Sequence, residues 1–227
     1  MTDAPTFEHT RAPTQIYLIS PLQVDGDFPD RLARALDAGL KGRHRIAAFQ
    51  FRVKDVEDHA AARLAAPLQK ICESREIAFI VNDSVALAKR LGADGVHLGQ
   101  DDLAREGGVK VARAELGGEA QIGVTCHGSR HMALEAGEEG ADYVAFGAYY
   151  PTTTKEVEHT AEADLLTWWQ GLFEIPCVAI GGITAENVAP LVRAGADFIA
   201  VSGGVWNGDE AANVVALTEA IRAAFEG

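Results

Sequence analysis

The chain has 227 residues with 33 acidic and 20 basic side chains, which gives a formal net charge of −13 at pH 7. With 48% hydrophobic and 23% charged residues, it has the composition of an ordinary globular protein of one large domain or two small ones. The acidic balance argues against nucleic acid as a partner, because a protein that neutralises phosphates needs a basic face.

Membrane insertion and secretion are not indicated by the sequence. No uncharged segment approaches the length of a membrane span, and the N-terminus lacks the basic flank and apolar core of a signal peptide. The three cysteines, Cys72, Cys126 and Cys177, are too widely spaced for a disulfide framework or a zinc site. We therefore expect reduced, packed thiols and a cytoplasmic location.

Eight short apolar segments follow a polar N-terminal arm, residues 1–14. Most are continuously apolar, as in IAFIV, YVAFGA and CVAIGGI, which is typical of strands buried on both faces of a parallel sheet. The expected strands are Gln15–Ser20, Ile46–Val53, Ile77–Asp83, Gly95–Gly99, Gln121–Cys126, Tyr143–Ala148, Cys177–Ile183 and Phe198–Gly204.

Helical patterns separate these strands. Four are well defined by capping residues or an apolar stripe: Asp55–Ser74, Ser129–Gly140, Thr184–Gly195 and Asp209–Phe225. Two are weaker, Leu103–Leu116 with two internal glycines and Ala161–Phe173 with a pair of tryptophans.

Alternation of strands and helices from end to end predicts parallel strands joined by right-handed crossovers. Eight such units in about 210 residues close a barrel more readily than they fill an open sheet. We therefore predict a single (β/α)8 TIM barrel over residues 15–227. A doubly wound sheet is the alternative, but no GxGxxG motif follows the first strand.

Polar side chains gather where the predicted strands end, and TIM barrels carry their active sites at that end. Along the second strand, alternation turns Gln50, Arg52 and Lys54 to one side. Burying three such side chains without partners would be costly, so we interpret them as a clamp for an anion. A solvated rim or an ion network inside the barrel is the alternative.

Carboxylates follow the next two strands. Asn82 and Asp83 end the third, and Asp101 and Asp102 follow the fourth. Asp83 with either of the latter would provide the carboxylates that Mg²⁺ combines with waters and substrate phosphates. Although Asn-Asp is equally typical of a turn or a helix cap, its place beside a cationic clamp favours Mg²⁺ and a diphosphate.

The later strand ends indicate a second anion. Pro151–Lys155 (PTTTK) offers hydroxyl donors and a point charge, although such threonines also occur in ordinary loops. Gly181-Gly182 and Ser202–Gly204 are small enough for backbone N–H groups to approach a phosphate. His97, inside the fourth strand, is expected to be packed and hydrogen-bonded rather than catalytic.

Taken in order, these motifs resemble the thiamine phosphate synthase family. The resemblance is carried by Gln50-x-Arg52-x-Lys54, Asn82-Asp83, GADGVHLGQDD at Gly92–Asp102, PTTTK, and AIGGI at Ala179–Ile183. It implies a transferase that couples 4-amino-5-hydroxymethyl-2-methylpyrimidine diphosphate with 4-methyl-5-hydroxyethylthiazole phosphate. Thiamine phosphate and diphosphate would form by a Mg²⁺-assisted dissociative displacement.

The resemblance also implies a role for individual residues. The pyrimidine diphosphate would be bound by Gln50, Arg52, Lys54, Asn82, Thr125 and Lys155, with Arg52, Lys54 and Lys155 as the catalytic residues. Mg²⁺ would be bound by Asp83 and Asp102, and the thiazole phosphate by Thr152, Thr154, Gly182, Ser202 and Gly203. Three family positions differ here: Thr125 replaces a serine but keeps the hydroxyl, Ser84 replaces an arginine after Asn-Asp, and the phosphate-site serine is replaced by Gly203 or shifted to Ser202. The first strand also ends in Ile19-Ser20-Pro21 rather than in the acidic residue usual in the family.

Two other functions compete with this one. A relative of the thiazole tautomerases would share the barrel but tends to lose the diphosphate residues, which are present here. A non-catalytic sensor of thiamine phosphate would keep the monophosphate site and need no Mg²⁺. Two small phosphorylated substrates are the expected partners, and the oligomeric state is left open, a homo-oligomer included.

Overall fold

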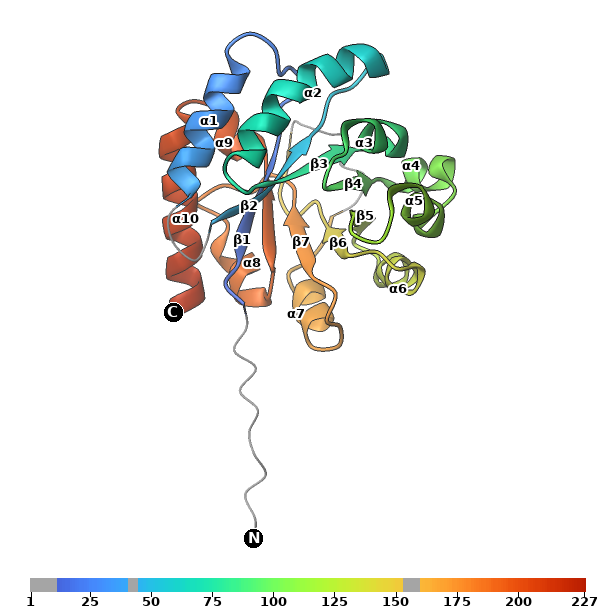
Figure 1. Ribbon diagram of the computed structural model, residues 1–227. Coiled ribbons are helices and arrows are strands. Elements are labelled where there is room, and N and C mark those ends of the chain that lie inside the picture. The colour runs from blue at the N-terminus through green and yellow to red at the C-terminus, as the bar shows by residue number, and fades with distance from the viewer. Residues whose placement is uncertain (1–11, 41–44, 153–159) are drawn as a thin grey trace, which may run out of the picture.

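A computed structural model describes residues 12–40, 45–152 and 160–227 of the chain, and within them the strands form a closed parallel barrel (Figure 1). The strands are β1 Gln15–Ile19, β2 Ile46–Phe51, β3 Ala78–Asn82, β4 Gly95–Leu98, β5 Gln121–His127, β6 Tyr143–Phe146, β7 Cys177–Ile180 and β8 Phe198–Val201. Each pairs with its neighbours in chain order, and β8 closes on β1. The TIM barrel is confirmed, and the open sheet is excluded.

Helices surround the barrel as an outer layer (Figure 1). They are α1 Phe28–Gly39, α2 Asp58–Glu73, α3 Val85–Leu91, α4 Gln100–Glu106, α5 Val109–Leu116, α6 Arg130–Glu139, α7 Asp164–Gln170, α8 Ala189–Ala194, α9 Gly203–Trp206 and α10 Glu210–Glu226. Helices α1 and α3 were not predicted. Each has a start signal nonetheless, a proline in the first turn of α1 and the side chain of Ser84, which accepts a hydrogen bond from Leu87 N, at α3.

Two glycines divide one expected helix into two shorter helices. The segment Leu103–Leu116 is the end of α4 followed by α5, because Gly107 and Gly108 between them have φ of 82° and 95°. These left-handed conformations suit glycine and interrupt a helix.

Two other boundaries differ from prediction at the ends of β7 and β8. The expected helix from Thr184 begins only at Ala189, because Asn187 Oδ1 accepts a hydrogen bond from Thr184 N at 2.8 Å and holds a turn there. The eighth strand ends at Val201 rather than Gly204, since Gly203 already begins α9.

Strand side chains alternate between two apolar clusters. One fills the barrel interior and comprises Tyr17, Ile19, Ala48, Ile80, Tyr143, Ala145, Val178 and Ala200. The larger one lies between the barrel and the helices, where the rings of Phe51 and Phe79 stack 5.9 Å apart. Within the barrel, Gly123 makes room for an aromatic ring, because a Cβ at that position would collide with Tyr143.

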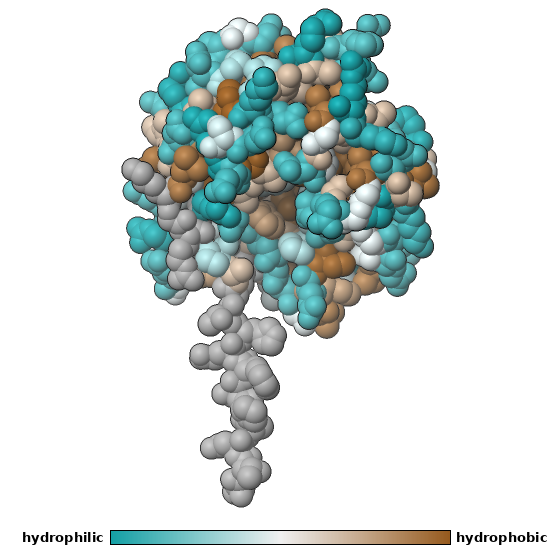
Figure 2. Space-filling model, in the orientation of Figure 1, coloured by the Kyte–Doolittle hydropathy of each residue, from teal (hydrophilic) through white to brown (hydrophobic). Residues whose placement is uncertain are grey.

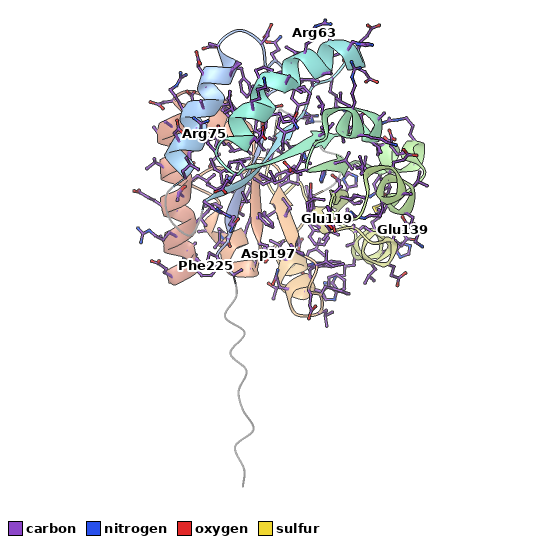
Figure 3. The ribbon with its side chains drawn as sticks, viewed as in Figure 1. Arg63, Arg75, Glu119, Glu139, Asp197 and Phe225 are labelled. Carbon is purple, nitrogen blue, oxygen red and sulfur yellow. The ribbon has the colours of Figure 1, made fainter. Side chains whose placement is uncertain are left out.

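Hydrogen bonds and an ion pair join neighbouring elements at the N-terminal end of the barrel. Asp197, labelled in Figure 3, accepts hydrogen bonds from Cys177 N at 2.8 Å and Gln170 Nε2 at 2.5 Å. Arg75, also labelled, pairs with Asp37 of α1 at 2.7 Å.

The face shown in Figure 2 is largely hydrophilic, with hydrophobic residues in small separate areas. In the described parts of the chain, every helix is too short or too polar to cross a membrane.

Candidate active site

The C-terminal end of β2 places polar side chains as the alternation predicts. Gln50 is 3% exposed and lies inside the barrel, whereas Phe51 packs between the barrel and the helices. Arg52 and Lys54 follow the last residue of the strand. Lys54 Nζ lies 3.6 Å from Asp83 Oδ2, so the cationic end of β2 reaches the carboxylate that follows β3.

Arg52 presents an unsatisfied cationic group. Its Nη1 is buried and has no hydrogen-bond partner among the described residues. Burial lowers the pKa of the Arg52 guanidinium, and the charge of Asp83 acts against that shift. An unsatisfied buried donor of this kind costs roughly 1–3 kcal/mol, so the side chain is arranged for an anion that supplies the missing acceptor.

Asp83 and Asp102 form a hydrogen-bonded carboxyl pair beside these cations. Burial, then the hydrogen bond and charge of Asp102, raise the pKa of Asp83 to about 6. Although burial acts to raise it, hydrogen bonds from Asp83 and Arg105 lower the pKa of Asp102. Asp101 is exposed, so Asp102 is the aspartate of the two that completes the pair.

The backbone holds Asp83 in place. Its φ of 69° is left-handed, a conformation that aspartate adopts more readily than most residues. Its N–H donates to His97 O at 2.9 Å, which fixes the end of β3 against β4. A hydrogen-bonded pair of carboxyl groups suits a divalent cation, which competes with the proton that binds there at lower pH. Among the described residues, no group of three or more His, Cys, Asp or Glu side chains could hold a metal ion.

Arg105 is a site residue that the sequence reasoning missed. Its Nη2 lies 2.8 Å from Asp102 Oδ1 and donates to Asp83 O at 3.2 Å. It follows Asp102 by three residues on α4, so the i,i+3 spacing was the available signal, but the expected helix began at Leu103 and excluded Asp102. Arg105 brings a positive charge next to Asp83 and Ser84, and the resemblance implies an arginine at the Ser84 position.

The loops after β6, β7 and β8 pack closely on the other side of the mouth. Tyr150 N donates to Gly181 O at 3.1 Å. Gly182 has a φ of 62°, and a Cβ there would collide with the carbonyl of Pro151. A Cβ on Gly204 would collide with the carbonyl of Ile183. These contacts require glycine and bring the three loops together.

Asn187 supports this half of the mouth and was also missed by the sequence reasoning. The side-chain Nδ2 of Asn187 donates to Gly182 O at 2.9 Å, and the backbone carbonyl of Asn187 accepts from Tyr150 OH at 2.7 Å. Ser202 precedes α9, and its Oγ donates to Ser20 O at 3.3 Å. Gly203, the first residue of α9, does not have a positive φ.

The remaining predicted residues divide between described and undescribed parts of the chain. Asn82 is the half-buried last residue of β3, and Thr152 is half-buried after β6. Thr125, on β5, is hydrogen-bonded to His97 Nε2 at 2.8 Å. His97 is 6% exposed and hydrogen-bonded, as predicted. Thr154 and Lys155 lie outside the described residues.

The structure therefore brings the predicted residues to one end of the barrel in two groups. On the β2–β5 half lie Gln50, Arg52, Lys54, Asn82, Asp83, Asp102 and Thr125, and on the β6–β8 half lie Thr152, Gly182, Ser202 and Gly203.

Comparisons with known proteins agree with one another. A family model described as thiamine monophosphate synthase matches residues 16–205. The thiamine-phosphate synthase of Erythrobacter litoralis is 63% identical over 217 residues, 95% of this chain and 99% of that protein. The thiamine-phosphate synthase of Rhodospirillum centenum is 53% identical over 194 residues, 85% and 89% of the two chains.

Among solved structures, the thiamine phosphate pyrophosphorylase from Pyrococcus furiosus is similar with a TM-score of 0.78. It is 27% identical, and the match covers 94% of this chain and 98% of that one. The tautomerase-like and sensor alternatives are not favoured by these matches.

Proposed function

The chain belongs to the thiamine monophosphate synthase family, and on that premise we propose how its active site works. It is an enzyme of thiamine biosynthesis, a transferase that makes thiamine phosphate. The proposed substrates are 4-amino-5-hydroxymethyl-2-methylpyrimidine diphosphate and 4-methyl-5-hydroxyethylthiazole phosphate. Residues 15–227 are the proposed catalytic domain, and the three buried free cysteines are compatible with the proposed cytoplasmic location.

One observation supports the diphosphate site above all others. The unsatisfied Nη1 of Arg52 lies in the same cluster of charges as the Asp83–Asp102 pair. A buried cationic donor beside paired carboxylates suits an anion that binds together with a divalent cation. A diphosphate with Mg²⁺ meets both requirements, since Mg²⁺ commonly joins one or two carboxylates to phosphate oxygens.

Bond cleavage would separate the pyrimidine methylene carbon from the diphosphate oxygen, and the bonding electron pair would leave with the diphosphate. The lone pair of the thiazole nitrogen would then form the new C–N bond. Arg52 and Lys54, with Lys155 by resemblance, would stabilise the negative charge that develops on the leaving group. A general base is unnecessary because the attacking nitrogen carries no proton.

Asp83 and Asp102 would hold Mg²⁺, which when bound neutralises part of the diphosphate charge. Arg105 orients Asp102 through the 2.8 Å contact to Oδ1. Such contacts to a metal-binding carboxylate commonly matter for metal affinity. The fit to Mg²⁺ rests on two carboxylates in direct contact and on the phosphate oxygens that the substrate would add.

The thiazole phosphate would occupy the β6–β8 half of the mouth. Gly182 and Gly203 would offer backbone N–H groups, and Ser202, Thr152 and Thr154 would offer hydroxyls. The two substrates would thus approach each other from opposite sides of the barrel, which orients the nitrogen toward the methylene carbon.

A complete reaction tests the proposal. The purified protein is incubated with both substrates and Mg²⁺, and thiamine phosphate and released diphosphate are measured separately. The expected result is equal amounts of the two products, and none when either substrate is omitted or the ion is chelated. Diphosphate release without thiamine phosphate, or product formed in excess chelator, would contradict it.

A further inference from the structure

A chain of hydrogen bonds crosses the interior of the barrel between two predicted substrate-binding residues. Gln50 Nε2 donates to Tyr17 OH at 3.0 Å, and Tyr17 OH lies 2.9 Å from Tyr143 OH. Tyr143 OH lies 3.2 Å from His97 Nδ1, and His97 Nε2 lies 2.8 Å from Thr125 Oγ1. The chain therefore connects β2, β1, β6, β4 and β5 in turn.

Because the residues of this hydrogen-bond chain are buried, each of their donors and acceptors needs a partner within the chain. Tyr17, Gln50, His97 and Tyr143 are all less than 9% exposed, so an unsatisfied donor or acceptor among them would be costly. Burial raises the pKa of Tyr17 to about 12 and raises that of Tyr143 well above its ordinary value. Both hydroxyls therefore keep their single proton at neutral pH.

One donor at the end of the chain sets the direction of every bond in it. Because the Gln50 amide nitrogen can only donate, Tyr17 OH accepts there. We assign the single proton of Tyr17 to the bond with Tyr143, since accepting a second bond from Tyr143 would leave that buried proton without a partner in the chain. Tyr143 then donates to His97 Nδ1, which leaves the proton of a neutral imidazole on Nε2, directed at Thr125. The reverse order would require Gln50 to present its carbonyl oxygen to Tyr17.

We propose that this buried chain is a positioning device that holds His97 as its Nε2–H tautomer and thereby fixes which substrate groups Gln50 and Thr125 can bind. The amide nitrogen of Gln50 gives one of its two N–H groups to Tyr17, which fixes the orientation of the amide and leaves the carbonyl oxygen, an acceptor, on the side away from Tyr17. With its oxygen accepting from His97, Thr125 has its hydroxyl proton left to donate. Tyr17, Tyr143 and His97 act through these two residues.

The polarity suits the proposed pyrimidine substrate, and in this respect the inference rests on the proposed function. A hydroxyl that donates suits an anionic diphosphate oxygen, and a carbonyl that accepts suits the exocyclic amino group of an aminopyrimidine. A reversed chain would direct an acceptor at the anion. The chain would therefore favour an aminopyrimidine over an oxopyrimidine, in which the ring substituent only accepts.

The direction of the chain is measurable without any substrate. The seven histidines are labelled with ¹⁵N, and His97 is identified by comparison with a His97→Gln variant. The expected result is the Nε2–H tautomer in the unmodified protein, replaced in Tyr143→Phe by a mixture of tautomers. Tyr149→Phe is the matched control, since its buried hydroxyl has no partner among the described residues. A His97 in the Nδ1–H form or as an imidazolium would overturn the proposal.

Kinetics then test the effect on the ligands. Tyr143→Phe should raise KM for the pyrimidine diphosphate about tenfold, the scale of losing one oriented hydrogen bond, with KM for the thiazole phosphate unchanged. Equal changes in both constants would indicate a general disturbance and would overturn the positioning role. If the protein made no thiamine phosphate, the tautomer measurement would still decide the direction of the chain, so failure of the proposed function is distinguishable.

Discussion

The side chain of Ser20 forms hydrogen bonds with both the backbone N–H and the backbone carbonyl of Arg52. Its buried hydroxyl accepts a hydrogen bond from Arg52 N at 2.9 Å and donates one to Arg52 O at 3.1 Å. Ser20 directly follows β1, so the neighbouring strand fixes the position of the Arg52 backbone, from which the guanidinium side chain extends.

Ser20→Ala should therefore weaken binding of the pyrimidine diphosphate. Loss of two neutral hydrogen bonds of about 1 kcal/mol each predicts a rise in KM of about tenfold or more for this substrate. Steady-state kinetics with each substrate varied separately measures the effect. Ser74→Ala is the control, because that exposed hydroxyl donates to Ile71 O and accepts from Arg75 Nη1 just after α2, at the other end of the barrel. An unchanged KM in Ser20→Ala would show that the backbone contacts do not position Arg52.

Asp102→Asn should lower turnover by about a hundredfold or more, the range for lost electrostatic stabilisation in an active site. Asp101→Asn provides a matched comparison with the same chemical change one residue away on an exposed side chain, and it should leave turnover nearly unaltered. Circular dichroism checks that both variants fold. Near-normal turnover by Asp102→Asn would remove that residue from the proposed Mg²⁺ site.

Cation binding should depend on pH through Asp83. Because its pKa is raised to about 6, the carboxyl group keeps its proton below that pH and releases it above. A divalent cation must displace this proton, so Mn²⁺ affinity should fall as the pH drops through about 6 and level off above it. Electron paramagnetic resonance of free Mn²⁺ follows the titration, and Asp83→Asn should abolish the dependence. An affinity that is constant across this range would contradict the assignment.

Ser202→Ala should weaken thiazole phosphate binding by about 1–2 kcal/mol and leave the pyrimidine diphosphate nearly unaffected. Titration calorimetry with each ligand separately provides the comparison. If both ligands weakened equally, the division of the mouth into two halves would be wrong.

Gly203→Ser should bind the thiazole phosphate as well as or better than the unmodified protein. Its φ is not positive, and a Cβ there would lie 3.2 Å from the flexible end of Asn207. Gly204→Ser is the contrasting variant and should bind the ligand poorly, because its Cβ would collide with the backbone carbonyl of Ile183. Thermal unfolding of both variants separates loss of binding from loss of folding. Weaker binding by Gly203→Ser would show that the amide region tolerates no side chain.

The strands, and the location of the β2–β5 residues at the mouth of the barrel, were predictable because each depends on local sequence. A continuously apolar run marks a strand buried on both faces, and the residue that ends it must lie at the mouth of a barrel. Gln50 and Asp83 follow from this reasoning without knowledge of any contact. The choice between Asp101 and Asp102 does not follow from this reasoning, since it depends on where α4 begins.

The interior hydrogen-bond chain shows what local sequence does not reveal. Tyr17 and Tyr143 are separated by 126 positions, and in the sequence each reads as an ordinary apolar strand residue. Their contact arises only when the barrel closes and places β1 and β6 across its interior. Arg105 was missed for a different reason, because the expected helix began at Leu103 and left Asp102 outside the helix that carries Arg105.

Closure of the barrel by β1 and β8 affects how the protein is made. Among the strands of the barrel, β1 leaves the ribosome before the others, yet one of its two neighbours, residues Phe198–Val201, follows after all of them. Helix α1 likewise packs against α10, which is synthesised after every strand of the barrel. During translation the nascent chain therefore carries an unpaired strand edge and an uncovered apolar helix face, which are surfaces that favour aggregation and chaperone binding.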